Sequence, residues 1–286
     1  MSNPYLHPQR IRGALRTLDL RPSRGMGQNF LLDADALATI VTAAELAPTD
    51  LVVEVGPGLG VLTWELTRQA AHTIAIELDR RLAARLTEEF AGQPLTIVQA
   101  DVLQVRPGDL LPADTHTSGY KLVANLPYAI TSAVLRHFLE ADLSPTLSVV
   151  LVQWEVAQRI TAGPGDLSIL AHSVQLYAEP TIIARVPASS FLPAPAVDSA
   201  VLRLRRRQQL AVAVDDVDRL FRVIKAGFLH GRKQLGNALP SGLAAMGFDV
   251  PRATALVALA AAGIDPQRRA ETLTLAEWAR LDAEIW

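Results

Sequence analysis

The chain has 286 residues, half of them apolar, and a formal net charge of −2. This length and composition allow one large domain or two smaller ones with buried cores. The absence of cysteine excludes disulfides, thiolate metal sites and a cysteine nucleophile, and it fits a reducing cytoplasm. No apolar run reaches the 18 residues of a membrane span, and the start of the chain lacks a signal-peptide core, so we expect a cytoplasmic protein without membrane contact.

The N-terminal stretch is basic and shows no sustained periodicity. Residues 1–28 contain five arginines and one acid, and we predict a mobile basic arm over residues 1–24. Two further basic clusters occur late in the chain, and such clusters are typical of phosphate contacts. The three clusters are Arg10, Arg12, Arg16, Arg21 and Arg24; Arg203, Arg205, Arg206 and Arg207; and Arg219, Arg222, Lys225, Arg232 and Lys233.

Strands and helices are expected to alternate over the first half of the chain. Asp33 is a suitable N-cap for a helix to about residue 46. Apolar runs predict strands over residues 51–55, 73–78, 95–98, 121–125 and 147–153, and helical spacing predicts helices after Gly60, after Asp79, over 131–140 and over 154–161. This order predicts an α/β domain with a mostly parallel sheet, flanked by helices on both faces.

The second half of the chain changes character near residues 206–212. Before it, we expect a helix over 167–178 and strands over 180–186 and 200–204, which are separated by a proline-bearing loop. After it, the pattern predicts only helices, over 215–229, 232–239, 251–262 and 274–283. We therefore expect a sheet domain over residues 25–207 and a small all-α domain over 208–286.

Four candidate site residues lie at predicted strand ends: Gly56, Glu77, Asp101 and Asn125. Ligands of parallel sheets bind beyond the carboxyl ends of the strands, so these residues should meet in one cleft. After Asn125, Pro127 prevents the strand from continuing, and Tyr128 is placed on a stiff turn. An amide, backbone carbonyls and an aromatic ring at this rim suit an aminated flat ring such as adenine.

The glycine turn at positions 56, 58 and 60 favours a particular cofactor. A dinucleotide fingerprint would need a glycine where the chain has Val61, and no Walker Gly-Lys-Ser/Thr follows. Glu77 lies at the distance from the turn at which an acid accepts hydrogen bonds from a ribose hydroxyl pair. A ligand with ribose and adenine but no pyrophosphate fits best, which indicates S-adenosyl-L-methionine. The histidines lack metal-ligand spacing, so we predict no metal site.

The sequence resembles the ribosomal RNA adenine N6,N6-dimethyltransferases, most of all the KsgA-type small-subunit enzymes. The related macrolide-resistance methylases share the first domain but usually carry isoleucine where this chain has Leu126. The resemblance rests on five motifs in order: Gly27-Gln-Asn-Phe-Leu31, Glu54-Val-Gly-Pro-Gly58, Glu77-Leu-Asp79, Asn125-Leu-Pro-Tyr128 and Phe191-x-Pro-x-Pro-x-Val-Asp-Ser199.

The resemblance implies a Rossmann-like class I methyltransferase domain and a role for each motif residue. Asn125, Leu126, Tyr128 and Phe191 are expected at the target base, with Tyr128 and Phe191 stacking on a flipped adenine. Cofactor contacts are expected from Asn29, Leu31, Gly56, Gly58, Glu77, Leu78, Asp101, Val102 and Asn125. RNA contacts are expected from Arg21, Arg24, Arg222, Lys225, Arg232 and Lys233.

The chemistry implied is transfer of methyl groups to the amino group of adenosines, two adjacent ones, in small-subunit ribosomal RNA. Oxygen acceptors at Asn125 and Leu126 would favour a nucleophilic nitrogen, and positioning would supply most of the rate. The partner expected is the small ribosomal subunit, with the enzyme as a monomer. Two alternatives remain: a large-subunit methylase that confers macrolide-type resistance, and an RNA-binding assembly factor in which methylation is secondary.

Overall fold

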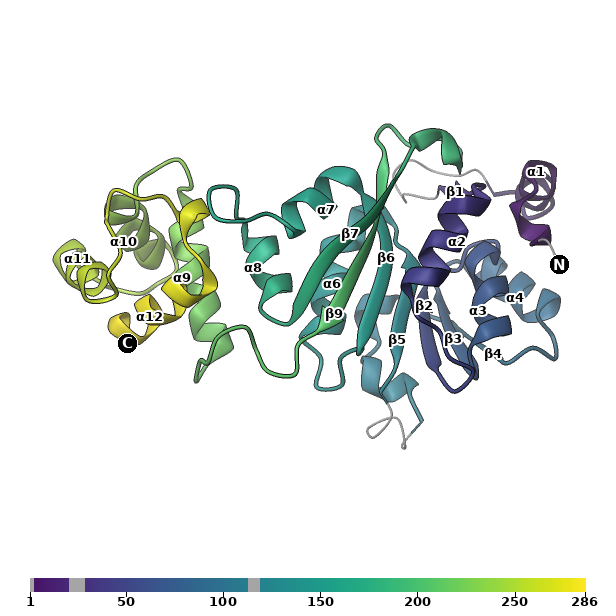
Figure 1. The fold of residues 1–286 in the computed structure, drawn as a ribbon, viewed down its shortest axis with the longest axis horizontal. Helices are drawn as coiled ribbons and strands as arrows, with labels where there is room; N and C mark the ends of the chain where they lie inside the picture. Colours follow the sequence, from purple (N-terminus) through teal and green to yellow (C-terminus); the bar gives the residue numbers. More distant parts are fainter. Residues whose placement is uncertain (1–2, 21–28, 113–118) are drawn as a thin grey trace. The chain divides into compact units, whose positions relative to one another are not determined.

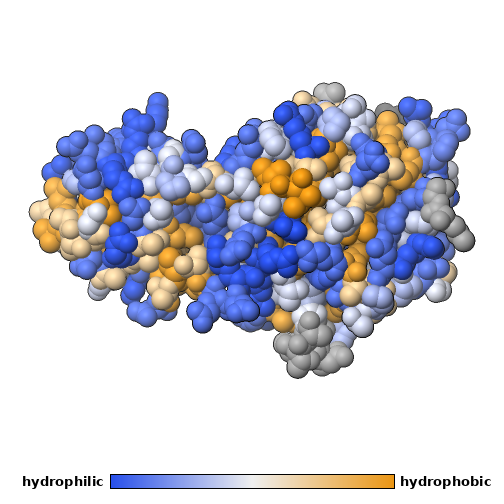
Figure 2. Space-filling model, viewed as in Figure 1, coloured by the Kyte–Doolittle hydropathy of each residue, from blue (hydrophilic) through white to orange (hydrophobic). Residues whose placement is uncertain are grey.

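A computed structural model describes residues 3–20, 29–112 and 119–286. The chain divides into two compact units, Met1–Ala157 with Glu179–Arg206, and Gln158–Ala178 with Arg207–Trp286. No helix in the described ranges combines the length and the apolar composition needed to cross a bilayer. On the face seen in Figure 2, hydrophilic residues predominate and hydrophobic residues form scattered patches.

The first unit is built on a seven-stranded sheet in the order β4-β3-β2-β5-β6-β9-β7 (Figure 1). Neighbouring strands from β4 to β6 are parallel, and β9 is antiparallel to β6. The strands are β2 Leu51–Val55, β3 His72–Glu77, β4 Leu95–Gln99, β5 Lys121–Asn125, β6 Leu147–Gln153, β7 Ala178–Val186 and β9 Ser199–Arg206. The α/β sheet expected from the alternating pattern is confirmed.

Helices flank this sheet and bury their apolar faces (Figure 1). Asp33 caps α2 as predicted, since its carboxylate accepts hydrogen bonds from the amides of Asp35 and Ala36 at 3.0 Å. The helices of the first unit are α1 Pro8–Thr17, α2 Ala34–Ala43, α3 Val61–Gln69, α4 Arg80–Glu89, α6 Thr131–Leu139 and the start of α7 Trp154–Ile160. A small two-stranded sheet pairs β1 Phe30–Leu31 with β8 Phe191–Leu192.

Strand order places a ligand crevice between β2 and β5. The chain winds outward from β2 through β3 to β4, and β5 then returns to the other side of β2. This reversal is the topological switch point at which ligands of open α/β sheets bind. The carboxyl ends of β2, β3 and β5 carry Gly56, Glu77 and Asn125, so the sheet itself brings the predicted residues to one edge.

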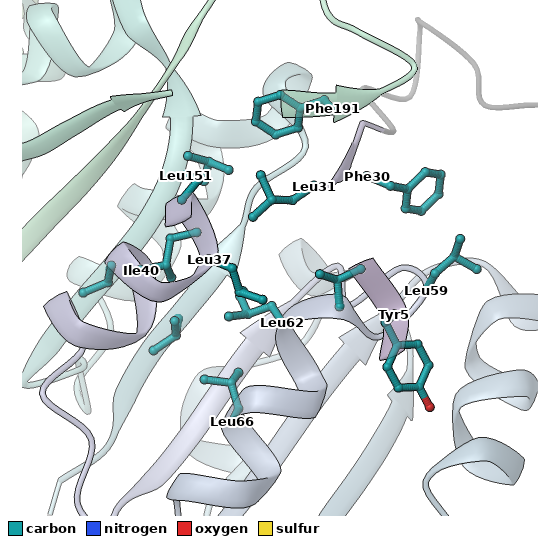
Figure 3. Close-up of a cluster of buried hydrophobic side chains, with 14 of the residues drawn as sticks. Tyr5, Phe30, Leu31, Leu37, Ile40, Leu59, Leu62, Leu66, Leu151 and Phe191 are labelled. Carbon is teal, nitrogen blue, oxygen red and sulfur yellow. The ribbon is translucent and has the colours of Figure 1, made fainter. Parts of the chain in front are cut away.

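The prediction of a mobile N-terminal arm was wrong for the described part of residues 1–24. Residues Pro4–Leu6 form a 3-10 helix and α1 follows, with Tyr5, Ile11 and Leu15 buried in the core of the first unit. The Tyr5 ring stacks on Phe90 with centroids 5.3 Å apart (Figure 3 shows Tyr5 in this cluster). The apolar positions lie on one helix face, but interleaved arginines hide that spacing in the sequence. Arg21 and Arg24 lie outside the described residues.

The second unit is helical, as expected, but its boundaries differ from those predicted. It takes in residues 158–178, which precede β7 in the chain, as well as those from Arg207 onward. His172 lies in the helix Ile169–Gln175, and its imidazole is hydrogen-bonded to the carbonyl of Leu273 at 3.0 Å. Such long-range contacts join this helix to the second unit. The helices are α8 Ile169–Gln175, α9 Val217–Leu229, α10 Leu235–Ala245, α11 Arg252–Ala261 and α12 Leu275–Ile285.

The helix predicted to end at residue 239 instead continues through Pro240 to Ala245. Leu239 and Leu243 are fully buried in the core of the second unit. Gly242 lies so close to α9 that a Cβ there would sit 2.0 Å from the carbonyl oxygen of Ala226. Tertiary packing on both sides of the proline therefore outweighs the lost helix hydrogen bond.

Candidate active site

A cavity of about 500 Å³ opens at the switch point of the sheet. It is lined by all four of the predicted strand-end residues, Gly56, Glu77, Asp101 and Asn125. Of the other residues predicted to contact a cofactor, Asn29, Leu31, Gly58, Leu78 and Val102 also line it. The expected convergence of distant strand ends in one cleft is therefore confirmed as geometry, whereas the role of each residue stays a prediction.

The glycine turn and Glu77 form one hydrogen-bonded unit. Gly56 and Gly58 have φ values of +67° and +59°, a left-handed conformation that glycine adopts without strain. This turn directs the Gly58 amide at Glu77, which accepts a hydrogen bond of 3.1 Å at Oε2 and another of 2.9 Å from the Asp79 amide at Oε1. Burial raises the pKa of Glu77, although these amide hydrogen bonds oppose the shift.

Asn125 is oriented by the N-terminal motif. Its Nδ2 donates a hydrogen bond of 3.0 Å to the carbonyl of Asn29, which leaves Oδ1 as the outward acceptor. Among the described residues, no group donates a hydrogen bond to that oxygen. The following side chain, Leu126, is buried at 1 % exposure, so only its backbone can act in the site.

Tyr128 is half-buried just beyond the cavity lining. Its hydroxyl makes a hydrogen bond of 2.5 Å with Ser199 Oγ, and this holds the ring against the start of β9. Burial raises the pKa of Tyr128, so the phenol keeps its proton at neutral pH. Ser199 was not predicted as part of the site, although it ends the family motif that begins at Phe191.

Phe191 is placed differently from the stacking position that the resemblance implies. Its ring is 3 % exposed, it does not line the cavity, and its backbone lies opposite Leu31 in the β1–β8 pair. Figure 3 shows it among the core side chains near Leu31 and Leu151. In this conformation Phe191 is a core residue, because β8 turns it toward the sheet. Stacking on a base would require the ring to turn outward, and that role stays a prediction.

The structure also identifies a cavity residue that the sequence prediction did not assign, Glu54. It is the second-to-last residue of β2, and its Oε2 accepts a hydrogen bond of 2.7 Å from the Thr63 hydroxyl. Burial raises its pKa to about 8 despite that hydrogen bond, with a further contribution from the charge of Glu77. Two signals in the sequence marked it: a lone carboxyl in an otherwise apolar strand, and its place at the start of the motif Glu54-Val-Gly-Pro-Gly58.

Four bases of the second unit that were predicted to contact RNA are exposed, and none forms an ion pair with another described residue: Arg222, Lys225, Arg232 and Lys233. Arg222 lies over the Phe248 ring at 5.8 Å. Other members of the basic clusters have structural partners instead. Arg219 pairs with the buried Asp282 at 3.0 Å, and Arg203 and Arg205 both pair with Glu45.

A model of the ribosomal RNA adenine dimethylase family matches residues 21–281. The chain belongs to the ribosomal RNA adenine dimethylase family. It is 46% identical over 267 residues to a protein named ribosomal RNA small subunit methyltransferase A from Dehalococcoides mccartyi strain CBDB1, a match that covers 93% of this chain and 89% of that protein. A protein of the same name from Moorella thermoacetica is 43% identical, with 97% of both chains covered.

Solved structures share the fold of this chain. This dimethylase-family chain is 30% identical to the 23S rRNA methyltransferase ErmE, with a TM-score of 0.67, 90% of this chain covered and 99% of that one. A dimethyladenosine transferase from Plasmodium falciparum shares the fold at a TM-score of 0.73 and 24% identity, with 88% and 95% covered. The class I methyltransferase fold implies a methyl donor for the family.

Proposed function

We propose that this protein transfers methyl groups from S-adenosyl-L-methionine to the N6 nitrogens of adenosines, two adjacent ones, in small-subunit ribosomal RNA during ribosome maturation. It would act as a monomer in the cytoplasm. The observation that carries the proposal is the meeting of the glycine turn, Glu77, Asp101 and Asn125 in one cavity at the switch point of the sheet. The names of the small-subunit relatives support the choice of RNA.

The cavity fits the donor's nucleoside. Both Glu77 oxygens already accept one amide hydrogen bond, and each retains a lone pair for a ribose hydroxyl. Leu78 is 62% exposed and lines the cavity, where it offers an apolar surface to a base. Asp101 also lines the cavity and can accept a hydrogen bond from an amino group. The volume of about 500 Å³ is in the range of small-molecule sites.

The chain's own groups prepare the target nitrogen. When bound, the donor supplies a methyl group that its sulfonium already activates. The Asn125 Oδ1 and the Leu126 carbonyl would accept hydrogen bonds from the adenine amino group. These bonds would favour a lone pair that is localised on the amino nitrogen, and therefore nucleophilic, over one that is delocalised into the ring. Tyr128 would stack on the base that has left its helix, a step that costs a few kcal/mol and that stacking offsets. Positioning then supplies most of the rate.

The exposed bases Arg222, Lys225, Arg232 and Lys233 support a role for the second unit in holding RNA through its phosphates. Arg21 and Arg24 are proposed for the same task on the basis of the family resemblance. The separate helical unit would then supply affinity, whereas the cavity in the first unit would supply the chemistry.

The test is methyl transfer from labelled S-adenosyl-L-methionine to purified, unmodified ribosomal subunits, followed by mass mapping of the methylated adenosines. We expect dimethyladenosine in the small subunit at two neighbouring positions. Methylation of the large subunit alone would show a resistance-type methylase, and it would overturn the proposed RNA. Absence of donor binding in calorimetry would instead support a role as an RNA-binding assembly factor.

A further inference from the structure

Glu54 presents an unpartnered carboxyl oxygen at the cavity. The residue is 1% exposed, between Val53 and Val55 in a strand without other charged residues. Its Oε2 is held by the Thr63 hydroxyl at 2.7 Å. No described residue donates a hydrogen bond to Oε1, and Glu54 is among the residues that line the cavity. A buried acid with one free oxygen is costly unless a ligand satisfies it.

The cavity around Glu54 has a strongly one-sided charge. Its described lining contains four carboxyl groups and neither lysine nor arginine: Glu54 on β2, Glu77 at the end of β3, Asp79 before α4 and Asp101 after β4. Thr63 on α3 is not among the lining residues, and its neutral hydroxyl contacts Glu54. Asp79 is paired with Arg81 at 2.9 Å, whereas no described residue forms an ion pair with Glu54, Glu77 or Asp101. A cationic ligand would therefore offset the charge of the cavity better than an anionic or neutral one.

Burial, the largest cause, holds the pKa of Glu54 at about 8, and the charge of Glu77 adds to the shift. Without a cationic ligand, Glu54 therefore keeps its proton at neutral pH. A positive charge brought into the same dry cavity stabilises the carboxylate instead.

We propose that Glu54 is a positioning residue for the methyl donor, which gives up its proton to solvent as the positively charged donor binds and regains it once the methyl group has left. This inference rests on the proposed function. The resulting carboxylate would offset the sulfonium charge and hold the donor in the cavity. After transfer the product is a neutral thioether, so the carboxylate loses its counter-charge, takes up a proton from solvent and holds the product less tightly.

The test measures protons released on binding, with no RNA present and no turnover. S-adenosylmethionine and S-adenosylhomocysteine are titrated at pH 7 in two buffers of different ionisation enthalpy. We expect the wild-type protein to release about 0.5–1 proton more with the first ligand than with the second. Glu54→Gln should abolish that difference. The amino groups of the ligands titrate in both proteins, so the comparison isolates the carboxyl group.

Thr63→Val is the matched control, because it removes the hydroxyl beside Glu54 and leaves the acid. It should retain the difference in proton release. A difference that is equal in wild-type and Glu54→Gln proteins would overturn the inference while the proposed function stands. Failure of the wild-type protein to bind S-adenosylmethionine would overturn the proposed donor itself.

A second measurement needs no variant that alters the cavity. Infrared difference spectra of the wild-type protein should lose the C=O band of a buried protonated carboxyl when S-adenosylmethionine is added, and keep it with S-adenosylhomocysteine. A band that persists with both ligands would also overturn the inference. The infrared measurement uses only the wild-type protein, so it tests the inference even if Glu54→Gln fails to fold.

Discussion

The side-chain amide of Asn125 donates a hydrogen bond of 3.0 Å to the backbone carbonyl of Asn29, 96 positions earlier in the chain. This bond joins the end of β5 to the residue that precedes β1, and both residues line the cavity. It fixes which end of the amide faces the site, because Nδ2 is used and Oδ1 is left as the acceptor.

Substituting Asn125 should abolish methyl transfer with little effect on folding. Asn125→Ala removes the acceptor for the target amine, and Asn125→Asp places a carboxylate against the Asn29 carbonyl. Both should lower methyl incorporation by about 100-fold or more, as for other groups that stabilise a reacting centre. Single-turnover methylation of small-subunit RNA measures this. Gln93→Ala, which removes an exposed amide outside the cavity, should remain at the wild-type rate, and near-normal rates in both Asn125 variants would contradict the assignment.

Tyr128 should act through its ring more than through its hydroxyl. Tyr128→Phe loses only the 2.5 Å hydrogen bond to Ser199 and should keep most of the activity. Tyr128→Ala removes base stacking, which is worth about 1–3 kcal/mol, and should lower the rate by about tenfold or more. Methylation rates of the two variants at saturating RNA separate the contribution of the hydroxyl from that of the ring. Equal losses in both variants would show that the hydroxyl matters, and Ser199→Ala should then share the defect.

Gly58→Ala should weaken donor binding because of backbone strain beside Glu77. Gly58 has φ +59°, and an added Cβ would lie 3.1 Å from the Phe30 ring. A left-handed conformation costs other residues about 1–2 kcal/mol, so the turn should shift and move its amide from Glu77. We expect about a tenfold loss of affinity by calorimetry. Gly92→Ala is the matched control, since Gly92 has φ +81° but nothing within 4 Å of the added Cβ.

The stability of the ligand-free protein should fall with rising pH because of Glu54. Its folded-state pKa of about 8 lies above the ordinary value of 4.5. At pH values between these two, the folded protein therefore binds more protons than the unfolded chain. The free energy of unfolding should decrease by up to about 1.4 kcal/mol per pH unit in that window. Denaturant unfolding of Glu54→Gln should show a smaller decrease between pH 5 and 8. Parallel pH profiles for the two proteins would contradict the assigned pKa.

Removing the four exposed bases of the second unit that were predicted to contact RNA should change the salt dependence of RNA binding. Arg222, Lys225, Arg232 and Lys233, all replaced by glutamine, should reduce the slope of log affinity against log salt by about 3. Donor binding in the first unit should stay unchanged. Arg80→Gln, an exposed base of the first unit, should alter the slope by less than one. An unchanged slope in the fourfold variant would place the phosphate contacts elsewhere.

Much of the site could be predicted because strand ends are local features. Val55 ends a β-branched apolar run, glycine follows at once, and Asn125 precedes a proline that stops its strand. Parallel strands put such ends at one edge, so the meeting of Gly56, Glu77 and Asn125 required only the order of strands and helices. The family motifs added residues such as Asn29 and Leu31, whose position depends on contacts far from them in sequence.

Composition, apolar spacing and turn residues by themselves determined the α/β sheet, the helical tail and the cofactor edge, because each depends on neighbours within a few positions. Only the tertiary structure decided that α1 packs against the core, that residues 158–178 join the second unit, that Phe191 faces inward and that Glu54 is held without its charge at neutral pH. These outcomes depend on burial and on partners tens of residues away, and a linear pattern does not record how much water a side chain retains.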